Sequence, residues 1–274
     1  MIWVNVSFVL IILYLLFFIY SFIEKYLIQV KTYKLNIKKD DFNGFKIIFL
    51  TDFHYSEIVS LRFIRKIIKR VNNMNPDLIL LGGDYISTRE AHINPVFKEL
   101  KELKAKYGVY GVIGNHDFAV SKHLILEAMK NAGIVSLDNK SYWIKKGNDR
   151  IKIGGVSDYL LDKPDITPTI NEVTCDDFII LVSHNPDYVE SIKDQKINLM
   201  LSGHTHGGQV TIFGLYAPYI PSKYKQKYRT GHKLVNKINL IISNGIGVIG
   251  LPIRFFARPQ IVVVDLIYNG GDSN

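Results

Sequence analysis

Cysteine is almost absent from this chain of 274 residues, where Cys175 stands alone. A single thiol excludes a disulfide scaffold and any zinc module built from several cysteines. Hydrophobic residues make up 47% of the chain and charged residues 22%, a mixture that excludes a disordered or fibrous protein. The length predicts one globular domain, or one domain with an appendage.

Charged residues are missing from residues 1–23, which are almost continuously apolar. At ~1.5 Å per residue, a helix of this length extends ~34 Å and exceeds the ~30 Å hydrocarbon core of a bilayer. A cleaved signal peptide is the alternative. However, no Lys or Arg precedes the apolar run, the run is too long, and neither an Ala-x-Ala site nor a twin-arginine motif accompanies it. We therefore predict an uncleaved, single-pass transmembrane anchor.

Lysine is frequent immediately after this anchor, at Lys25, Lys31, Lys34, Lys38 and Lys39. The positive-inside rule then predicts that the rest of the chain lies on the cytoplasmic side of the membrane. Residues 24–44 are expected to form a juxtamembrane linker or a first strand, and residues 45–274 the globular domain.

Acidic residues are missing from a second segment, residues 207–264. This segment contains eight basic residues, Lys223, Lys225, Lys227, Arg229, Lys233, Lys237, Arg254 and Arg258, which account for nearly all of the net charge of +9. Such a segment suits an anionic partner, namely phosphate, nucleic acid or anionic lipid. The alternative is a solvated basic surface without a partner.

An alternation of strand and helix patterns begins at residue 45. Strands are expected at 45–51, 77–81 and 108–113, and amphipathic helices at 61–74, 95–106 and 121–131, the last capped by Ser121. This order predicts a parallel sheet with right-handed crossovers. A second, more antiparallel sheet is indicated by six later strand patterns without long helices between them: 151–156, 178–183, 198–202, 209–213, 240–243 and 261–266.

Five predicted strands run directly into side chains that can bind metal ions. These side chains are Asp52, His54, Asp84, Asn115, His184, His204 and His206. Ligands bind at the carboxyl ends of the strands of an α/β sheet, and this oxygen and nitrogen set without a thiolate suits Mn, Fe or Zn. Seven ligands are too many for one tetrahedral ion but suit two ions that share a carboxylate. Glycines 82, 83, 114 and 203 are expected where the backbone must turn sharply or approach the ions.

Taken together, these motifs resemble the five-block signature of the calcineurin-like metallophosphoesterases. The blocks are Asp52-x-His54, Gly83-Asp84, Gly114-Asn115-His116-Asp117, His184 and Gly203-His204-x-His206. The resemblance covers roughly residues 45–267, and the tail from Ser243 to Pro259 is similar to the bacterial membrane-anchored branch. It implies an α/β fold, a four-layer α/β/β/α sandwich preceded by one transmembrane helix. It also implies two divalent ions, Mn in the first place and Fe or Zn as alternatives.

The resemblance assigns a role to each motif residue. The first metal would be held by Asp52, His54 and His206, the second by Asn115, His184 and His204, and Asp84 would bridge the two. The neighbouring His116 resembles the family's histidine that is not a ligand and acts as a proton donor to the substrate. Asp117 would orient His116 or, as the alternative, cap the following helix. Asn244, Arg254 and Arg258 are candidates for phosphate binding, although the branch usually has Arg at the position of Asn244.

A phosphoric ester or pyrophosphate hydrolase at the membrane surface is the function that these features favour. Enzymes that cleave UDP-2,3-diacylglucosamine are similar to the membrane-anchored branch, so a lipid-linked phosphate is the expected substrate. A phosphodiesterase or nuclease with a soluble substrate is the alternative, and a non-catalytic membrane-tethered binder is disfavoured by the complete ligand set. The absence of a second Asp shortly after Asp84 argues against a Ser/Thr protein phosphatase.

Overall fold

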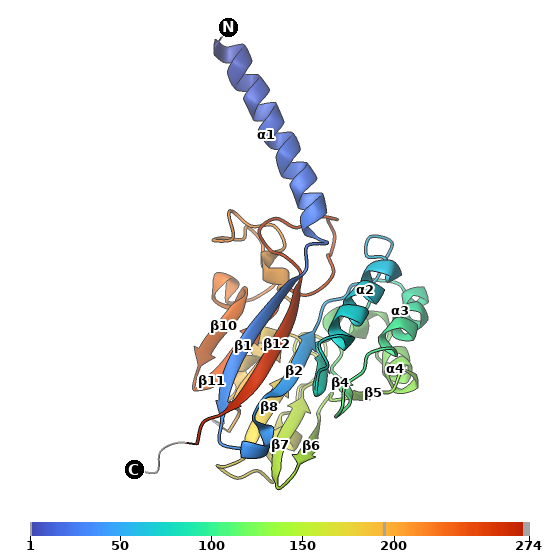
Figure 1. Cartoon of the computed structure of the whole chain (residues 1–274). Coiled ribbons are helices and arrows are strands. Elements are labelled where there is room, and N and C mark those ends of the chain that lie inside the picture. Colours follow the sequence, from blue (N-terminus) through green and yellow to red (C-terminus); the bar gives the residue numbers. More distant parts are fainter. Residues whose placement is uncertain (1, 194–195, 271–274) are drawn as a thin grey trace.

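Two six-stranded sheets pack face to face in the computed structural model, which describes residues 2–193 and 196–270 (Figure 1). In the first sheet the strand order is β1-β12-β2-β3-β4-β5, and in the second β10-β11-β9-β8-β7-β6. The first sheet contains β1 (Gln29–Ile37), β2 (Phe45–Leu50), β3 (Leu78–Leu81), β4 (Val109–Gly111), β5 (Ile134–Ser136) and β12 (Gln260–Tyr268). The second contains β6 (Lys140–Lys146), β7 (Asp149–Gly155), β8 (Phe178–Val182), β9 (Leu199–Ser202), β10 (Gly231–Val235) and β11 (Ile238–Ile242).

The apolar faces of the two sheets form the central core, which includes Ile47, Phe49, Ile153 and Leu199. The other face of the first sheet is covered by α2 (Leu61–Asn72), α3 (Ile93–Leu100) and α4 (Asn115–Asn131). The outer face of the second sheet carries a thinner layer, made of the short helix α5 (Thr167–Ile170) and 3₁₀ turns. The predicted four-layer α/β/β/α sandwich is therefore confirmed.

Strand directions follow the sequence patterns closely. In the first sheet the β12–β2 pair is antiparallel and the other pairs are parallel. In the second sheet both edge pairs, β10–β11 and β6–β7, are antiparallel, while its centre is parallel. The second sheet is thus the more antiparallel one, as predicted, but its membership differs from the prediction. The strand expected over 261–266 is β12 and belongs to the first sheet, whereas β6 and β10 of the second sheet have no counterpart among the expected strands. The parallel centre of the second sheet gathers strand ends at one edge.

Two of the predicted elements need correction, and a third is part of a longer helix. The helix expected over 95–106 ends at Leu100, and the strand expected over 209–213 is a loop with isolated bridges from Val210 and Ile212. The helix expected over 121–131 is the second half of α4. Ser121 has an extended backbone at the kink, and its hydroxyl accepts a hydrogen bond from the Leu124 amide, so it caps that half as predicted.

The helix α1 (Ile2–Glu24) projects from one end of the sandwich (Figure 1). By length and composition it can cross a membrane, because the window Ser7–Glu24 is strongly apolar and only 11% buried. The following segment is mostly strand: β1 begins at Gln29, so residues 25–28 alone connect the helix to the first sheet. Residues 24–44 therefore contain the strand β1, and the connection between α1 and the first sheet is short.

The lower end of α1 is fixed to the loop before β12. The fully buried carboxylate of Glu24 accepts hydrogen bonds from the backbone amides of Phe256 and Ala257. The ring of Phe17 also lies 4.5 Å from the ring of Phe255, and the Arg254 amide donates to the Ser21 carbonyl. These contacts attach the helix to the folded domain at a defined position.

Candidate metal centre

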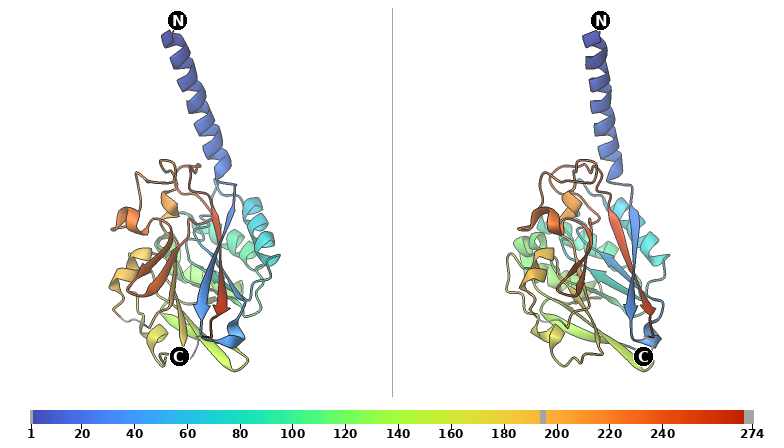
Figure 2. Two further views of the ribbon diagram at one scale, coloured as in Figure 1. Left: turned by 60° about the vertical axis from the view of Figure 1, so that its left-hand side comes forward. Right: turned by 90° about the vertical axis from the view of Figure 1, so that its left-hand side faces the viewer.

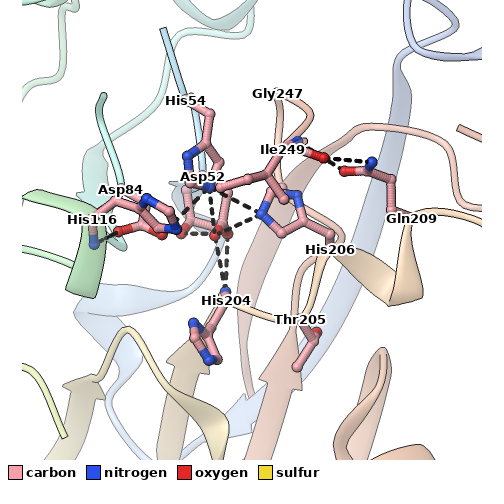
Figure 3. Close-up of polar contacts among 12 residues, drawn as sticks. Asp52, His54, Asp84, His116, His204, Thr205, His206, Gln209, Gly247 and Ile249 are labelled. Carbon is pink, nitrogen blue, oxygen red and sulfur yellow. Dashed lines mark hydrogen bonds and ion pairs between the residues drawn. The ribbon is translucent and has the colours of Figure 1, made fainter. Parts of the chain in front are cut away.

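Seven polar side chains from both sheets converge where β2, β3, β8 and β9 end. Figure 3 shows the cluster around Asp52, Asp84 and His204, with His54, His116 and His206 pointing toward it. All seven predicted ligands take part in the contacts described below: Asp52, His54, Asp84, Asn115, His184, His204 and His206. Because parallel strands place their carboxyl ends at one edge, residues more than 150 positions apart in sequence become neighbours.

The first half of the cluster contains Asp52, His54 and His206. The Nε2 atoms of the two imidazoles lie 3.0 Å apart. The Asp52 Oδ1 atom lies 3.9 Å from His54 Nε2 and 3.5 Å from His206 Nε2. The three side chains therefore aim their donor atoms at one small volume, as ligands of a shared ion do.

The second half contains Asn115, His184 and His204. The His184 Nε2 atom lies 3.1 Å from Asn115 Oδ1 and 3.2 Å from His204 Nδ1. On its other side, the Nδ1–H of His184 donates to the Gly82 carbonyl, which fixes the ring and leaves Nε2 to face the cluster. The central residue is Asp84, whose Oδ2 atom lies 3.4 Å from His54 Nε2 and 3.2 Å from His184 Nε2.

Close backbone packing around the site depends on glycine. A Cβ atom at Gly203 would lie 2.2 Å from Asp52 Oδ2, and one at Gly114 would lie 2.2 Å from Asp84 Oδ1. Either substitution would collide with a ligand oxygen, which confirms the prediction for these two glycines. The site also contains backbone strain, because five ligands have a left-handed φ of 45–67°: Asp52, His54, Asp84, His204 and His206.

The two buried carboxylates of the site, Asp52 and Asp84, have pKa values shifted in opposite directions. Burial raises the pKa of Asp52 to about 6. Burial acts in the same direction on Asp84, but the neighbouring His184 and His54 outweigh it and hold the pKa of Asp84 well below its usual range. Burial alone would lower the pKa of His184, yet the Asp84 carboxylate raises it to about 10. The Asp84 carboxylate is therefore the negatively charged centre between the two ligand groups.

The donor set fits two divalent ions. Burial lowers the pKa of both His54 and His204 to about 3, so these imidazoles are neutral, the form in which histidine binds metal. Carboxylate, amide and imidazole donors without a thiolate suit Mn, Fe or Zn, and Asp84 lies within reach of both halves.

The neighbouring His116 also faces the site, at the start of α4. Its backbone amide donates to Asp84 Oδ1, and its Nδ1–H donates to the Ser87 carbonyl at 2.8 Å. The Nε2 atom is therefore left for a substrate, and His116 lines the cavity described below. Its ring nitrogen also lies close enough to His54 and Asp84 to belong to a third metal-type cluster, so the geometry permits both a proton-donor and a ligand role.

The second predicted catalytic residue, Asp117, is fully buried and has a different partner from the one expected. Its carboxylate accepts hydrogen bonds from the backbone amides of Tyr85, Ile86 and Gly114. It therefore caps α4 and clamps the loop after Asp84, while the Ser87 carbonyl orients the His116 ring. These bonds are those of a helix cap, as in the alternative, although Asp117 is the third residue inside α4 and Gly114 is the N-cap.

The three candidate phosphate-binding residues lie behind or beside the site. Arg254 is fully buried, and its guanidinium donates to the carbonyls of Gly247, Ala257, Asn244 and His206. Asn244 is also buried and bonds to Thr230 and to the carbonyl of Arg258, whose own side chain is exposed. In this arrangement the Arg254 guanidinium supports the backbone around His206. Its contact with a phosphate stays a prediction, which the structure does not favour because the side chain is fully buried.

A cavity of ≈ 1070 Å³ opens above the metal centre. Its floor is formed by His54, Asp84, Asn115 and His116. Most of its walls are apolar and come from two loops that the motifs did not identify: Val210, Pro218, Tyr219, Ile220, Pro221, Ile249, Leu251 and Ile253. The amide side chain of Gln209 joins these loops by bonding to both the amide and the carbonyl of Ile249 (Figure 3).

One cation in this wall was missed as a site residue, namely Lys223. Its backbone amide donates to the buried Asp187 carboxylate, which also accepts from the Ser222 hydroxyl. Asp187 therefore holds the turn that places Lys223 at the cavity. Lys223 belongs to the basic segment, but the sequence does not distinguish it from Lys225 and Lys227 in the same segment.

Comparison with known proteins places the chain among metallophosphoesterases. The family model of the calcineurin-like phosphoesterases matches residues 45–208. An uncharacterised metallophosphoesterase, YkuE of Bacillus subtilis (strain 168), is 31% identical over 89% of this chain and 87% of its own length. The phosphodiesterase YaeI of Escherichia coli (strain K12) is 33% identical over 86% of this chain and 87% of its own length.

A further relative, from Danio rerio, is described as a transmembrane protein with a metallophosphoesterase domain. It is 27% identical over 83% of this chain and 54% of its own length. Among solved structures, a dimetal phosphatase from Danio rerio superposes with a TM-score of 0.49 at 12% identity, over 77% of this chain and 90% of that one. Since the family model covers more than half of the chain, the protein belongs to the calcineurin-like phosphoesterase family and is a phosphoester hydrolase.

Proposed function

We propose that this enzyme hydrolyses a phosphodiester or pyrophosphate bond in a lipid-linked substrate at the cytoplasmic surface of the membrane, with two Mn ions. The observation that carries the proposal is the composition of the cavity. Its floor offers metal ligands and His116, whereas its walls are mainly aliphatic and reach the exposed side chains of Tyr219 and Leu251. A hydrophilic substrate needs no such wall, but an acylated one gains by burying its chains there.

The chain's own residues have separable tasks in this reaction. Asp84 and its partners would hold the two ions, which in such sites activate water as a nucleophile and neutralise charge on the phosphoryl group. His116 is held by the Ser87 carbonyl so that its Nε2 can donate a proton to the leaving oxygen. Lys223 at the cavity wall is placed to attract the remaining phosphate charge.

Two features support the membrane location. The apolar α1 ends at the domain, and residues 25–28 alone separate it from β1, so the catalytic site cannot move far from the bilayer. Lysines 25, 31, 34, 38 and 39 follow the span, which favours the cytoplasmic side. Protease added to intact cells should therefore leave the domain uncut, and digestion from outside would contradict this orientation.

A comparison of acylated and deacylated substrates tests the proposal. The full-length protein, reconstituted in nanodiscs with Mn, should cleave UDP-2,3-diacylglucosamine with a higher kcat/KM than the deacylated analogue. Ile220→Ser with Ile253→Ser, at the apolar wall, should reduce that preference, whereas Leu234→Ser on the exposed edge strand β10 should not. Equal kcat/KM for both substrates would contradict the lipid proposal and favour a soluble phosphodiester or single-stranded nucleic acid, to be compared in the same assay.

A further inference from the structure

An exposed apolar loop lies beside the base of α1. We call residues 211–219 the rim loop. Its large side chains are unusually accessible, with Phe213 71%, Leu215 82% and Tyr219 75% exposed. Contiguous apolar surface of this kind on an ordered protein marks a contact with a partner or a membrane.

The rim loop is held firmly in this exposed arrangement. The Thr211 amide donates to the Phe255 carbonyl, and the Ile212 amide donates to the Tyr216 carbonyl, each at 2.7–2.9 Å. The guanidinium of Arg229 donates to the Gly214 carbonyl at 2.7 Å. Because the backbone is bonded on both sides, the apolar side chains are displayed by the fold itself.

The exposed surface is continuous with α1. The ring of Phe213 lies 5.7 Å from that of Phe256, and the ring of Phe256 lies 6.1 Å from that of Tyr20 on the helix. Figure 2 shows the loops of residues 207–222 and 245–258 at the end of the sandwich from which α1 emerges, while the β6–β7 hairpin lies at the opposite end. The rim loop therefore reaches the level of the last turns of the helix.

Exposed cations occur in the segments that adjoin this apolar surface. Lys223, Lys225 and Arg258 are exposed, and residues 207–264 contain no acidic residue. Lys25 follows α1 directly, with its ammonium group 5.0 Å from the ring centre of Tyr26. An apolar and aromatic centre with cations around it matches the boundary between acyl chains and anionic headgroups.

We propose that the rim loop is a second membrane contact, in which Phe213 and Leu215 enter the headgroup–acyl boundary of the leaflet that holds the end of α1. The sandwich is then held to the bilayer at two points. Tyr219 and Leu251, which are both exposed and line the cavity, place its opening against the same leaflet. This inference rests on the membrane span in the proposed function, but it does not depend on a lipid substrate.

Site-specific fluorescence in nanodiscs tests the contact with the full chain. The single native cysteine is replaced by Cys175→Ser, and an NBD label is attached at Leu215→Cys or at Leu234→Cys. Leu234 is a matched control, because it is 70% exposed but lies on β10. The label at 215 should be blue-shifted and should be quenched at least twofold by 5-doxyl lipid, and the label at 234 should show neither effect.

Each alternative gives a distinct result. Emission at 215 equal to that at 234 would contradict the proposal. A blue shift at 215 without doxyl quenching would also contradict it and would assign the surface to a second copy or to closure over the cavity. In addition, Phe213→Ser with Leu215→Ser should abolish doxyl quenching of a label at Tyr216→Cys while hydrolysis of soluble bis(p-nitrophenyl) phosphate is unchanged. Retained quenching in that variant would overturn the assignment to these two side chains.

Discussion

The floor and the walls of the cavity are built in opposite ways. The floor and the metal ligands around it are polar side chains that follow strand ends or begin α4, and several of them have strained backbones. The walls consist of loops with apolar and aromatic side chains that are partly or fully exposed. The floor is thus committed to one chemical task, phosphoryl transfer at a metal centre, whereas the walls determine which molecule reaches it.

The sharpest test of the floor is Asp84→Asn. Because one carboxylate lies within reach of both ligand groups, we expect loss of both metals and of nearly all hydrolysis. Elemental analysis of the purified protein measures the metal content, with the exposed Asp176→Asn as the control. A variant that retains two metals and normal hydrolysis would show that Asp84 does not bridge.

A second test separates proton donation from metal binding at His116. We expect His116→Ala to lose ~10²–10⁴-fold in kcat, the range of a general acid, with the metal content unchanged. The same variant measured by elemental analysis decides between the two roles that the geometry permits. If metal is lost together with rate, His116 is a ligand and the donor must lie elsewhere.

The buried carboxylate of Asp138, which bonds to the backbone just before α4, makes the free energy of unfolding depend on pH. This carboxylate accepts hydrogen bonds from the Ile113 amide and the Ser136 hydroxyl, and burial raises its pKa to about 6. A raised pKa favours the folded state at low pH, and this contribution is lost as the pH rises through about 6. Between pH 4 and pH 7 the wild type should therefore lose about 2 kcal/mol relative to Asp138→Asn, because pH 4 already lies slightly above the pKa of an unfolded Asp.

Urea unfolding at both pH values, with α1 held in detergent micelles, measures this difference. Subtracting the two proteins cancels the titration of all other groups. A difference in the free energy of unfolding that is equal at pH 4 and pH 7 would show that Asp138 has an ordinary pKa.

The smallest expected effect concerns the attachment of α1. Glu24→Ala removes the acceptor of two backbone amides at Phe256 and Ala257 and should cost ~1–3 kcal/mol in that loop. Faster hydrogen exchange of these amides is the measurement, and Glu57→Ala, at an exposed carboxylate, is the control. Metal content should not change, since the floor does not use Glu24, and a loss of metal would show that floor and walls are not independent.

The sequence predicts the floor much better than the walls, for a physical reason. Asp52, Asp84 and His184 can be recognised because each follows a short apolar strand within three residues. The carboxyl ends of parallel strands lie at the same edge of a sheet, so side chains that follow these strands become neighbours. Glu24 could not be recognised as a buried clamp, because its partners are backbone amides more than 230 residues away. The same limit explains Arg254, whose charge suggested a phosphate but whose donors all reach main-chain carbonyls or His206.

The exposure of individual side chains in loops is the second property that the sequence does not predict. Tyr219, Tyr224 and Tyr228 occur in one basic, aromatic stretch, yet Tyr228 is fully buried against the second sheet while Tyr219 is 75% exposed. Phe255 follows Arg254 directly in the sequence, but its ring contacts Phe17 of α1. Which of these aromatic side chains is buried depends on the path of the loop. A loop has no regular repeat in its sequence from which that path could be predicted.

The position of β12 has a consequence for how the protein assembles. In the first sheet β1 pairs with β12, and Gln29 aligns with Gln260, so the strand beside the membrane segment has its partner 231 positions later. During synthesis β1 must wait for nearly the whole chain before its hydrogen bonds can form, and contacts of such long range make folding slow. We expect that, in a nascent chain that stops before β12, α1 and β1 are not yet attached to the first sheet, because β1 joins that sheet through β12.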